Sequence, residues 1–302
     1  MTPTPSPTAS VTATPSTTPT FAATPTAAPS SSATATPYCP SASPTPTCGL
    51  TPTPALFVIA SGDYDGDGTS EIAVFRGSSG LWAVRGLTRI YFGETFDLPV
   101  PGDYGGDGTA DVTVFRAGEG LWWIRTLTRF YLGDDRDIPV PGDYDGDGSD
   151  DVAVFNADDG VWRVRGLTRV YFGAGADRPV PGDYDGDGTM NMATFRGSSR
   201  LWSVRQVTRF YFGSAGDRPV PADYLGEGTR VAGIFRPASG LWALRETTRA
   251  WFGAGGDRPQ PADYDGDGTD GIALFRPATA LWAVRGFTRS YFGEPGDIPI
   301  AR

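Results

Sequence analysis

The residues best suited to chemistry are closely spaced acids that recur along the chain. The first copy reads Asp-x-Asp-x-Asp-Gly-Thr-x-Glu from position 63 to position 71. Carboxylates at alternate positions of a tight loop can all point toward one hard cation, Gly68 permits the positive φ of the sharp turn, and the Thr69 carbonyl supplies another oxygen. This oxygen donor set, without His or Cys, favours Ca²⁺ over zinc, copper or Mg²⁺. Asp and Gly also form ordinary turns, but a fourth acid at position nine exceeds what a turn needs.

The six copies of this loop are not equal, and their differences grade the predicted sites. Copies one and three are complete. Copy two has Gly105 in place of the second acid, copy four ends in the neutral oxygen ligand Asn191, and copy six has Gly271 at the ninth position, so we expect weaker binding there. Copy five has Leu225 and Val231 at ligand positions, and we expect it to be empty.

The predicted calcium ligands are Asp63, Asp65, Asp67, Thr69 and Glu71 in copy one, Asp103, Asp107 and Asp111 in copy two, Asp143, Asp145, Asp147, Ser149 and Asp151 in copy three, Asp183, Asp185, Asp187, Thr189 and Asn191 in copy four, and Asp263, Asp265, Asp267 and Thr269 in copy six. Val74 stands where an EF-hand would need its bidentate Glu, so the predicted site is a strand-to-strand calcium loop.

The composition excludes most enzyme classes. The chain has no His, and all 25 of its basic residues are Arg, which removes histidine bases, Schiff-base lysines and imidazole-ligated zinc. All charged residues fall between Asp63 and Arg302, so the net charge of −10 sits on this block. An acidic block has no basic field for phosphates, and we expect no nucleic-acid partner. No apolar run approaches a membrane-spanning length, so we expect no membrane span.

The loops belong to an array with a period of 40 residues. Asp-Tyr recurs at positions 63, 103, 143, 183, 223 and 263, and six periods end at residue 302. Each period contains four short segments rich in β-branched and aromatic residues, in the first period residues 72–76, 81–85, 89–93 and 97–102, separated by Gly, Ser or Asp. Four strands in about 40 residues match a β-propeller blade. We therefore predict an all-β propeller of six four-stranded repeats over residues 55–302.

Residues 1–54 have a different composition. They contain 16 Thr, 8 Ser, 13 Pro and 9 Ala, too little apolar surface for a packed core, so we predict an unstructured, extended tail. Ser/Thr beside Pro is typical of linkers and also of stalks that carry O-linked glycans. Both interpretations remain open, and we expect some O-glycosylation. Cys39 and Cys48 match no metal or redox spacing, and a local disulfide between them is a further expectation.

Other recurrent residues indicate what each blade needs. Phe75 and Trp82 have counterparts in all six copies, which favours packing between blades over a sugar-stacking role for the Trp ring. Arg85, Arg89 and Asp97 also recur six times. This recurrence suggests a repeated Arg–carboxylate clamp between neighbouring blades, with solvated surface charge as an equal alternative.

The segment Tyr-Phe-Gly-x-x-x-Asp-x-Pro-Val-Pro-Gly-Asp-Tyr-Asp-Gly-Asp-Gly at positions 171–188 resembles the FG-GAP/VCBS-type repeats of the integrin α-subunit-like β-propeller superfamily. The resemblance covers residues 56–302. It implies calcium loops that join the first two strands of each blade, with the acids named above as metal ligands. It also implies adhesion, ligand recognition or sugar binding outside the cell, although this chain has six copies where the integrin ring has seven.

These observations favour a non-catalytic, calcium-binding adhesion or structural module that is extracellular or on the cell surface. A multivalent lectin that holds glycans between blades is the alternative. An enzyme is disfavoured, because a catalytic carboxylate pair should occur once whereas the acids here recur five or six times.

The first-strand segment occurs seven times for six blades. It begins with residues 55–62 and ends with a surplus copy at residues 297–302 that no loop follows. The surplus strand either closes its own ring or pairs with another chain, which would give a homo-oligomer or an end-to-end filament. Residues 56–59 and the tail are other possible connectors for such a filament.

Overall fold

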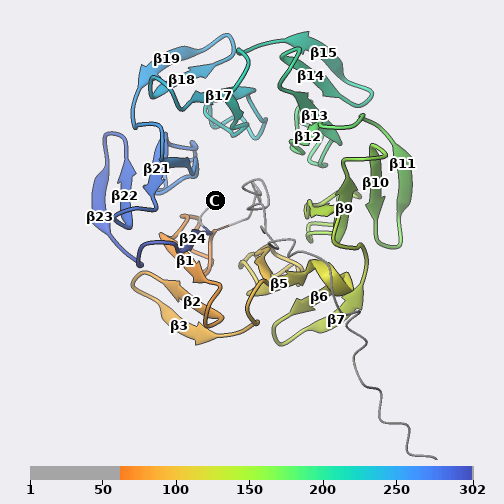
Figure 1. Cartoon of the computed structure of the whole chain (residues 1–302), viewed down its shortest axis with the longest axis vertical. Helices are drawn as coiled ribbons and strands as arrows, with labels where there is room; N and C mark the ends of the chain where they lie inside the picture. Colours follow the sequence, from red (N-terminus) through yellow and green to blue (C-terminus); the bar gives the residue numbers. More distant parts are fainter. Residues whose placement is uncertain (1–61, 301–302) are drawn as a thin grey trace, which may run out of the picture. The chain divides into compact units, whose positions relative to one another are not determined.

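The computed structural model describes residues 62–300, which form six four-stranded antiparallel sheets arranged in a ring (Figure 1). This arrangement confirms the predicted six-bladed, all-β propeller. The expectations for the Ser/Thr/Pro-rich tail, for Cys39 and Cys48, and for residues 55–61 concern residues outside this range. Within residues 62–300, no helix is long and apolar enough to cross a membrane.

Each blade has a very short inner strand followed by three four-residue strands toward the rim (Figure 1). The inner strands are β4 (Leu98–Pro99), β8 (Asp137–Pro139), β12 (Arg178–Pro179), β16 (Arg218–Pro219), β20 (Arg258–Pro259) and β24 (Ile298–Pro299). The second strands are β1 (Ala73–Arg76), β5 (Thr113–Arg116), β9 (Ala153–Asn156), β13 (Ala193–Arg196), β17 (Gly233–Arg236) and β21 (Ala273–Arg276).

The third strands are β2 (Leu81–Val84), β6 (Leu121–Ile124), β10 (Val161–Val164), β14 (Leu201–Val204), β18 (Leu241–Leu244) and β22 (Leu281–Val284). The outer strands are β3 (Thr88–Tyr91), β7 (Thr128–Tyr131), β11 (Thr168–Tyr171), β15 (Thr208–Tyr211), β19 (Thr248–Trp251) and β23 (Thr288–Tyr291), and one 3₁₀ turn, η1, spans Ala117–Glu119. Blade 1 is the sheet β24-β1-β2-β3, blade 2 is β4–β7, and blades 3 to 6 follow in chain order.

The recurrent aromatic residues fill the spaces between blades. Phe75 pairs with Trp82 across β1 and β2, both side chains are fully buried, and the same holds in every blade. The centroids of the Phe and Trp rings lie 4.9–5.4 Å apart in the six pairs. The indole N–H of Trp82 donates to the Phe92 carbonyl at 3.0 Å, so its polar atom is satisfied in the core. The prediction of inter-blade packing is therefore confirmed, and these Trp rings are not available for sugar stacking.

The conserved geometry of the links between blades requires glycine at one position. Gly93 has a φ of 97°, and a Cβ there would lie 2.9 Å from a methyl of Val114 in the next blade. Glycine occupies the equivalent position in all six repeats. This close approach brings each outer strand back to the inner strand of the following blade.

An Arg–carboxylate clamp exists, but it lies within each blade and not between neighbouring blades, and Arg85 and Arg89 are not its cations. Both Asp97 oxygens accept from Arg116 at the end of β5, with distances of 2.8 and 3.0 Å, and Asp97 is almost fully buried. Asp97 and the end of β5 lie at the same end of the blade, whereas Arg85 follows β2 at the opposite end, and this placement explains the correction. The pair recurs as Asp177–Arg196, Asp217–Arg236, Asp257–Arg276 and Asp297–Arg76.

Blade 3 satisfies the same buried carboxylate in another way. Asn156 replaces the arginine and donates to Asp137 at 2.9 Å, and Arg163 on the neighbouring strand β10 supplies the positive charge. Two arginines of the Arg85 series lie over aromatic rings instead. Arg165 and Arg245 lie over the rings of Phe130 and Phe210 in the preceding blades, at 3.9 and 4.2 Å from the ring centroids.

The surplus C-terminal strand closes the ring. β24 pairs antiparallel with β1, where Val74 is opposite Pro299 and Phe75 is opposite Ile298. Ile300 is buried, and its N–H donates to the Ala73 carbonyl at 3.0 Å. Of the two alternatives for the surplus strand, the structure therefore shows self-closure and not pairing with another chain, because β24 completes the first blade of its own ring.

Candidate metal centres

In blades 2 to 6 the acidic loop joins the inner strand to the second strand, whereas in blade 1 the loop precedes β1 and the inner strand is the C-terminal β24. Because successive strands are antiparallel, these loops lie at the same end of the ring as the turns between the third and outer strands; we call this the metal-loop end. The base of each loop is closed by the backbone, as where the Glu71 N–H donates to the Gly62 carbonyl at 2.8 Å. Gly66 and Gly68 adopt φ values of 78° and 88°, which let the chain turn tightly around the acids.

The first loop brings four carboxylates together. One oxygen each of Asp63, Asp65, Asp67 and Glu71 lies within 4.8 Å of the others. Loop amides hold Asp63, since the N–H groups of Gly66 and Gly68 donate to its two oxygens at 2.7 and 3.0 Å. The Tyr64 N–H donates to Glu71 Oε2 at 2.7 Å, which leaves the other oxygen of Glu71 for a ligand. The arrangement fits a hard cation held by carboxylate oxygens.

The electrostatics of the loop are those of crowded like charges. Burial raises the pKa of Glu71 to about 7, and the charges of Asp65, Asp63 and Asp67 act in the same direction. The hydroxyl and N–H of Thr69 lower the pKa of the exposed Asp67, because both donate to Asp67 Oδ1. A divalent cation bound among these oxygens would offset their mutual repulsion.

The other loops keep this arrangement to different degrees. Clusters of three carboxylates form in the loops of blades 3, 4 and 6; their members are Asp143, Asp145 and Asp151, then Asp183, Asp185 and Asp187, then Asp263, Asp265 and Asp267. Within residues 62–300, no such cluster is found in the loops of blades 2 and 5. In the loop of blade 2, the N–H groups of Tyr104 and Gly105 donate to Asp111 at 3.0 and 3.1 Å.

Two predicted ligands have surroundings that differ from expectation. Asp147 lies outside the three-carboxylate cluster of its loop and accepts from Ser149 at 2.6 Å. The carbonyl oxygen of Asn191 accepts from the Tyr184 N–H at 2.7 Å, and its amide nitrogen donates to Asp185 at 3.3 Å. An amide has one oxygen where a carboxylate has two. Because the Asn191 oxygen already accepts from Tyr184, the amide nitrogen is the atom that faces the carboxylate cluster of this loop.

The loop of blade 5 shows how the turn forms when it lacks a cluster of carboxylates. Asp223 Oδ1 accepts from the N–H groups of Leu225, Gly226 and Glu227, and Oδ2 accepts from Gly228 at 2.8 Å. The turn therefore forms around a single aspartate whose oxygens are satisfied by the loop backbone. That copy five binds no metal stays a prediction.

The six loops are joined to one another around the ring axis, which the sequence reasoning missed. The Ala110 N–H donates to the Asp63 carbonyl of the preceding loop, and the Ser70 N–H closes the circle on the Asp263 carbonyl. The equivalent bonds join the other loops, and all six measure 2.6–2.7 Å. Each potential metal site is thus connected through its first aspartate to the next loop.

A central cavity of about 550 Å³ lies inside this circle of loops. Ser70, Asp150, Met190, Arg230 and Asp270 line it, all at the position that follows Thr69 by one residue in its repeat, and the sixth copy has Ala110 there. Burial raises the pKa of Asp150 to about 7, although the Asp103 N–H donates to it at 3.0 Å. Asp270 instead pairs with Arg230 at 2.8 Å. The variation of this position among the six repeats, in size and in charge, was the available sequence signal.

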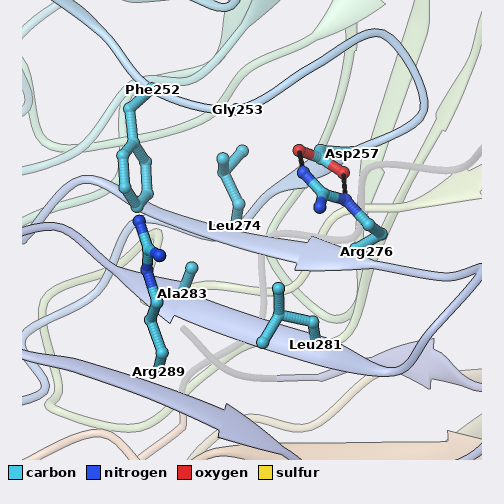
Figure 2. A pocket seen from close by; sticks show the side chains of 8 residues that line it. All are labelled: Phe252, Gly253, Asp257, Leu274, Arg276, Leu281, Ala283 and Arg289. Carbon is cyan, nitrogen blue, oxygen red and sulfur yellow. Dashed lines mark hydrogen bonds and ion pairs between the residues drawn. The ribbon is translucent and has the colours of Figure 1, made fainter.

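A second, smaller cavity lies between blades 5 and 6 (Figure 2). It measures about 150 Å³. The paired Asp257 and Arg276 lie at one side, and Phe252 and Arg289 lie at the other, with Leu274 between them (Figure 2). Position 283 is Ala in this blade, whereas the larger Trp123 and Arg163 occupy the same position in blades 2 and 3.

Comparison with known proteins adds little beyond the fold. No protein-family model matches the chain, and no curated protein matches it. Among solved structures, the chain is similar to that of an Agrocybe aegerita lectin described as recognising non-reducing terminal N-acetylglucosamine. The identity is 15%, the TM-score is 0.43, and the match covers 78% of this chain and 77% of the lectin chain. At this TM-score the likeness carries no argument about function.

Proposed function

We propose that the chain is a non-catalytic, calcium-binding propeller that serves as an adhesion or structural module outside the cell. The observation that carries the proposal is the group of four carboxylates in the first loop, whose oxygens lie within 4.8 Å of one another, together with the three-carboxylate groups in blades 3, 4 and 6. Asp63, Asp65, Asp67 and Glu71 would hold the ion in the first loop. The ion would supply positive charge that ties the loop together.

A structural role for the metal follows from where the loops lie. Every loop is linked by a backbone hydrogen bond to its neighbours, so a rigid loop restrains the next blade as well as its own. An ion that binds only the folded chain stabilises it by about 2.7 kcal/mol when its concentration is about 100 times the dissociation constant. Calcium would therefore strengthen the ring at its centre.

An extracellular setting suits these sites. The carboxylates are exposed or half-buried and three of the four clusters have only three members, so we infer weak binding. Weak calcium sites, with dissociation constants of about 10⁻⁴–10⁻³ M, are typical of extracellular modules. The Ser/Thr/Pro-rich composition of residues 1–54 is compatible with a stalk that presents the propeller, and its O-glycosylation stays a prediction.

Equilibrium dialysis of the full-length, chelator-stripped chain against Ca²⁺ and, separately, Mg²⁺ tests the proposal. We expect about four Ca²⁺ per chain, in line with the four carboxylate clusters, and little Mg²⁺ at the same concentration. A chain that retains no calcium at millimolar concentration would overturn the metal assignment. A stoichiometry of one would restrict the proposal to the first loop.

A glycan-binding function is a second candidate, which the exposed aromatic residues on the outer strands favour. Tyr91, Tyr131, Tyr171, Tyr211, Trp251 and Tyr291 occupy one position in the six blades and are 70–75% exposed. Each lies two residues after an arginine of the Arg89 series, so stacking and hydrogen-bonding groups are adjacent. Glycan-array binding that Tyr211→Ala weakens would support this candidate, and loss of the signal with a chelator would join it to the calcium sites.

A further inference from the structure

The second end of the ring, opposite the metal loops, has an uneven charge distribution. We call it the linker end, because it carries the inter-blade linkers, residues 92–97 in the first repeat, and the hairpins between second and third strands, residues 77–80 in the first repeat. The two segments touch, since the Phe92 N–H donates to the Gly80 carbonyl at 2.8 Å. At this end, each buried Asp97-type carboxylate pairs with an arginine, and in blades 1 and 2 the same arginines, Arg76 and Arg116, also contact Glu294, Glu94 and Glu119. The acids outnumber the arginines in these two blades, so this part of the linker end keeps a net negative charge.

Three adjacent blades make one half of the linker end acidic. Blade 1 contributes Glu294, and blade 2 contributes Glu94 and Glu119. The linker and hairpin of blade 3 contribute Asp134, Asp135, Asp158 and Asp159, against the single cation Arg136. All of these side chains are exposed or half-exposed.

The other three blades make the opposite half basic. In blades 4, 5 and 6 the residue after the clamp aspartate is Arg178, Arg218 or Arg258, where blades 1 to 3 have Ile298, Leu98 and Ile138. The hairpin of blade 4 adds Arg200. Apart from the buried clamp aspartates, the linkers and hairpins of these three blades contain no acid and consist of small or apolar residues except for Arg200.

The three arginines lie close enough to repel one another. Burial lowers the pKa of Arg218, and the charges of Arg178 and Arg258 lower it further. Arg218 is held in place, because its Nη1 donates to the Asp257 carbonyl at 2.8 Å. The positive charges of the three arginines add at this half of the linker end, and they favour a negatively charged surface opposite it.

An exposed aromatic side chain marks the middle of the acidic half. Phe96 in the linker of blade 2 is 80% exposed and has a φ of 76°. This left-handed conformation is strained for a bulky residue, and the equivalent position is Gly216 in blade 5 and Gly296 in blade 1. A strained aromatic side chain that is exposed to water is unfavourable on a free surface. In an interface, the same side chain can serve as an anchor residue.

We propose that two copies of the chain associate face to face through their linker ends, as a two-fold symmetric dimer. The acidic and basic halves each span three contiguous blades. The two-fold axis lies in the plane of the contact and passes between the two halves. It places blade 1 against blade 6 of the second copy, blade 2 against blade 5, and blade 3 against blade 4. Every acidic blade then faces a basic blade. This self-complementarity is the requirement for an isologous interface.

The anchor residue fits the same pairing. Phe96 of blade 2 faces blade 5 of the second copy, where the linker residues Ser214, Ala215 and Gly216 are small and leave room for a ring. Arg218 of that blade supplies a cation for the ring face. The dimer needs neither metal nor strand exchange, so it stands or fails independently of the proposed calcium function.

Sedimentation velocity of the full-length chain over a range of concentrations tests the dimer. We expect a monomer–dimer equilibrium that weakens at least tenfold between about 0.02 M and about 1 M salt, because exposed charges are screened at high salt. A chain that stays monomeric at low salt at the highest attainable concentration would overturn the proposal.

Charge reversal gives the sharper test. Glu94→Arg and Arg218→Glu should each abolish self-association, because each places like charges between blades 2 and 5. An equimolar mixture of the two variants should dimerise again, since opposite charges then meet at both symmetry-related contacts. Arg285→Glu makes the same charge change at the metal-loop end and should leave association unchanged. Failure of the mixture to associate, with both variants folded by circular dichroism, contradicts the pairing.

Phe96→Gly separates association from folding. We expect the melting temperature to rise, because glycine relieves the positive φ, while association weakens at least tenfold. Unchanged association would remove Phe96 from the interface. Binding of the wild-type chain to an anionic polysaccharide such as heparin, without any dimer, would assign the basic half to a polyanion and overturn the proposal.

Discussion

At the scale of single residues, the first aspartate of each loop has a different role from the acids that follow it. Asp63 and Asp223 both accept from loop glycine amides, at 2.7 and 3.0 Å in one case and 2.8 Å to each of two glycines in the other. Yet only the first of these loops has a carboxylate cluster. The first aspartate therefore forms the turn in both, and the acids two, four and eight residues later decide whether the loop can take a cation.

Two alanine substitutions should separate these roles. Asp65→Ala should remove calcium binding at the first loop and change the free energy of unfolding in chelator little, because Asp65 accepts only a long 3.3 Å bond from the Asp67 N–H. Asp223→Ala should leave calcium stoichiometry unchanged and lower the free energy of unfolding by about 1 kcal/mol, since several loop amides lose their acceptor. Calorimetric titration and urea unfolding measure the two effects. If Asp65→Ala and Asp223→Ala changed calcium binding equally, the first aspartate and the later acids would not have separate roles.

The buried clamp aspartate gives a second prediction at this scale. Arg276→Asn should lower the free energy of unfolding by about 2 kcal/mol, because Asp257 loses its charge partner while remaining buried; the 41% exposure of the Arg276 side chain limits the loss. Adding Ala283→Arg should restore most of the stability, since blade 3 already uses Asn156 and Arg163 in these positions. Urea unfolding of the single and double variants measures the recovery, and no recovery would contradict the equivalence of the two clamps.

At the scale of elements, the 40-residue period was enough to predict strands, blades and aromatic packing, because each repeat carries the same apolar spacing. It did not predict the clamp partner, because choosing between Arg85 and Arg116 requires knowing which end of a strand each occupies. It also left ring closure open, since residues 55–62 and 297–302 carry the same pattern and either can pair with β1. The circle of hydrogen bonds between loops involves backbone groups, which leave no trace in residue type.

Closure by β24 predicts how truncation acts. Deleting residues 297–302 should lower the melting temperature and promote association at raised concentration, because β1 becomes an unpaired edge and Arg76 loses Asp297. Differential scanning calorimetry and light scattering measure these effects. Glu294→Ala is the control for the melting temperature alone, since this 65% exposed partner of Arg76 should contribute less than about 1 kcal/mol. A truncated chain as stable and as small as the wild type would show that closure contributes nothing.

At the scale of the whole molecule, two closed circuits hold the blades together. One is the ring of sheets, completed by β24 on β1, and the other is the circle of loop-to-loop hydrogen bonds at the metal-loop end. An open array of repeats can unfold from its ends, whereas a closed ring has no terminal repeat from which to begin. The six blades should therefore unfold together.

Calcium should change the stability of this ring without changing its cooperativity. With calcium at about 100 times the dissociation constant, each occupied loop should add about 2.7 kcal/mol to the free energy of unfolding, and the four carboxylate clusters should act together because neighbouring loops are hydrogen-bonded. Calorimetric melting of the full-length chain should show a single propeller transition that shifts upward with calcium and returns with chelator. The same titration with Mg²⁺ serves as the control for general charge screening. If calcium split the melting transition into separate unfolding events of single blades, the loops would stabilise their own blades only. If Mg²⁺ raised the melting temperature as much as calcium, the carboxylates would respond to positive charge in general and not to a coordinated ion.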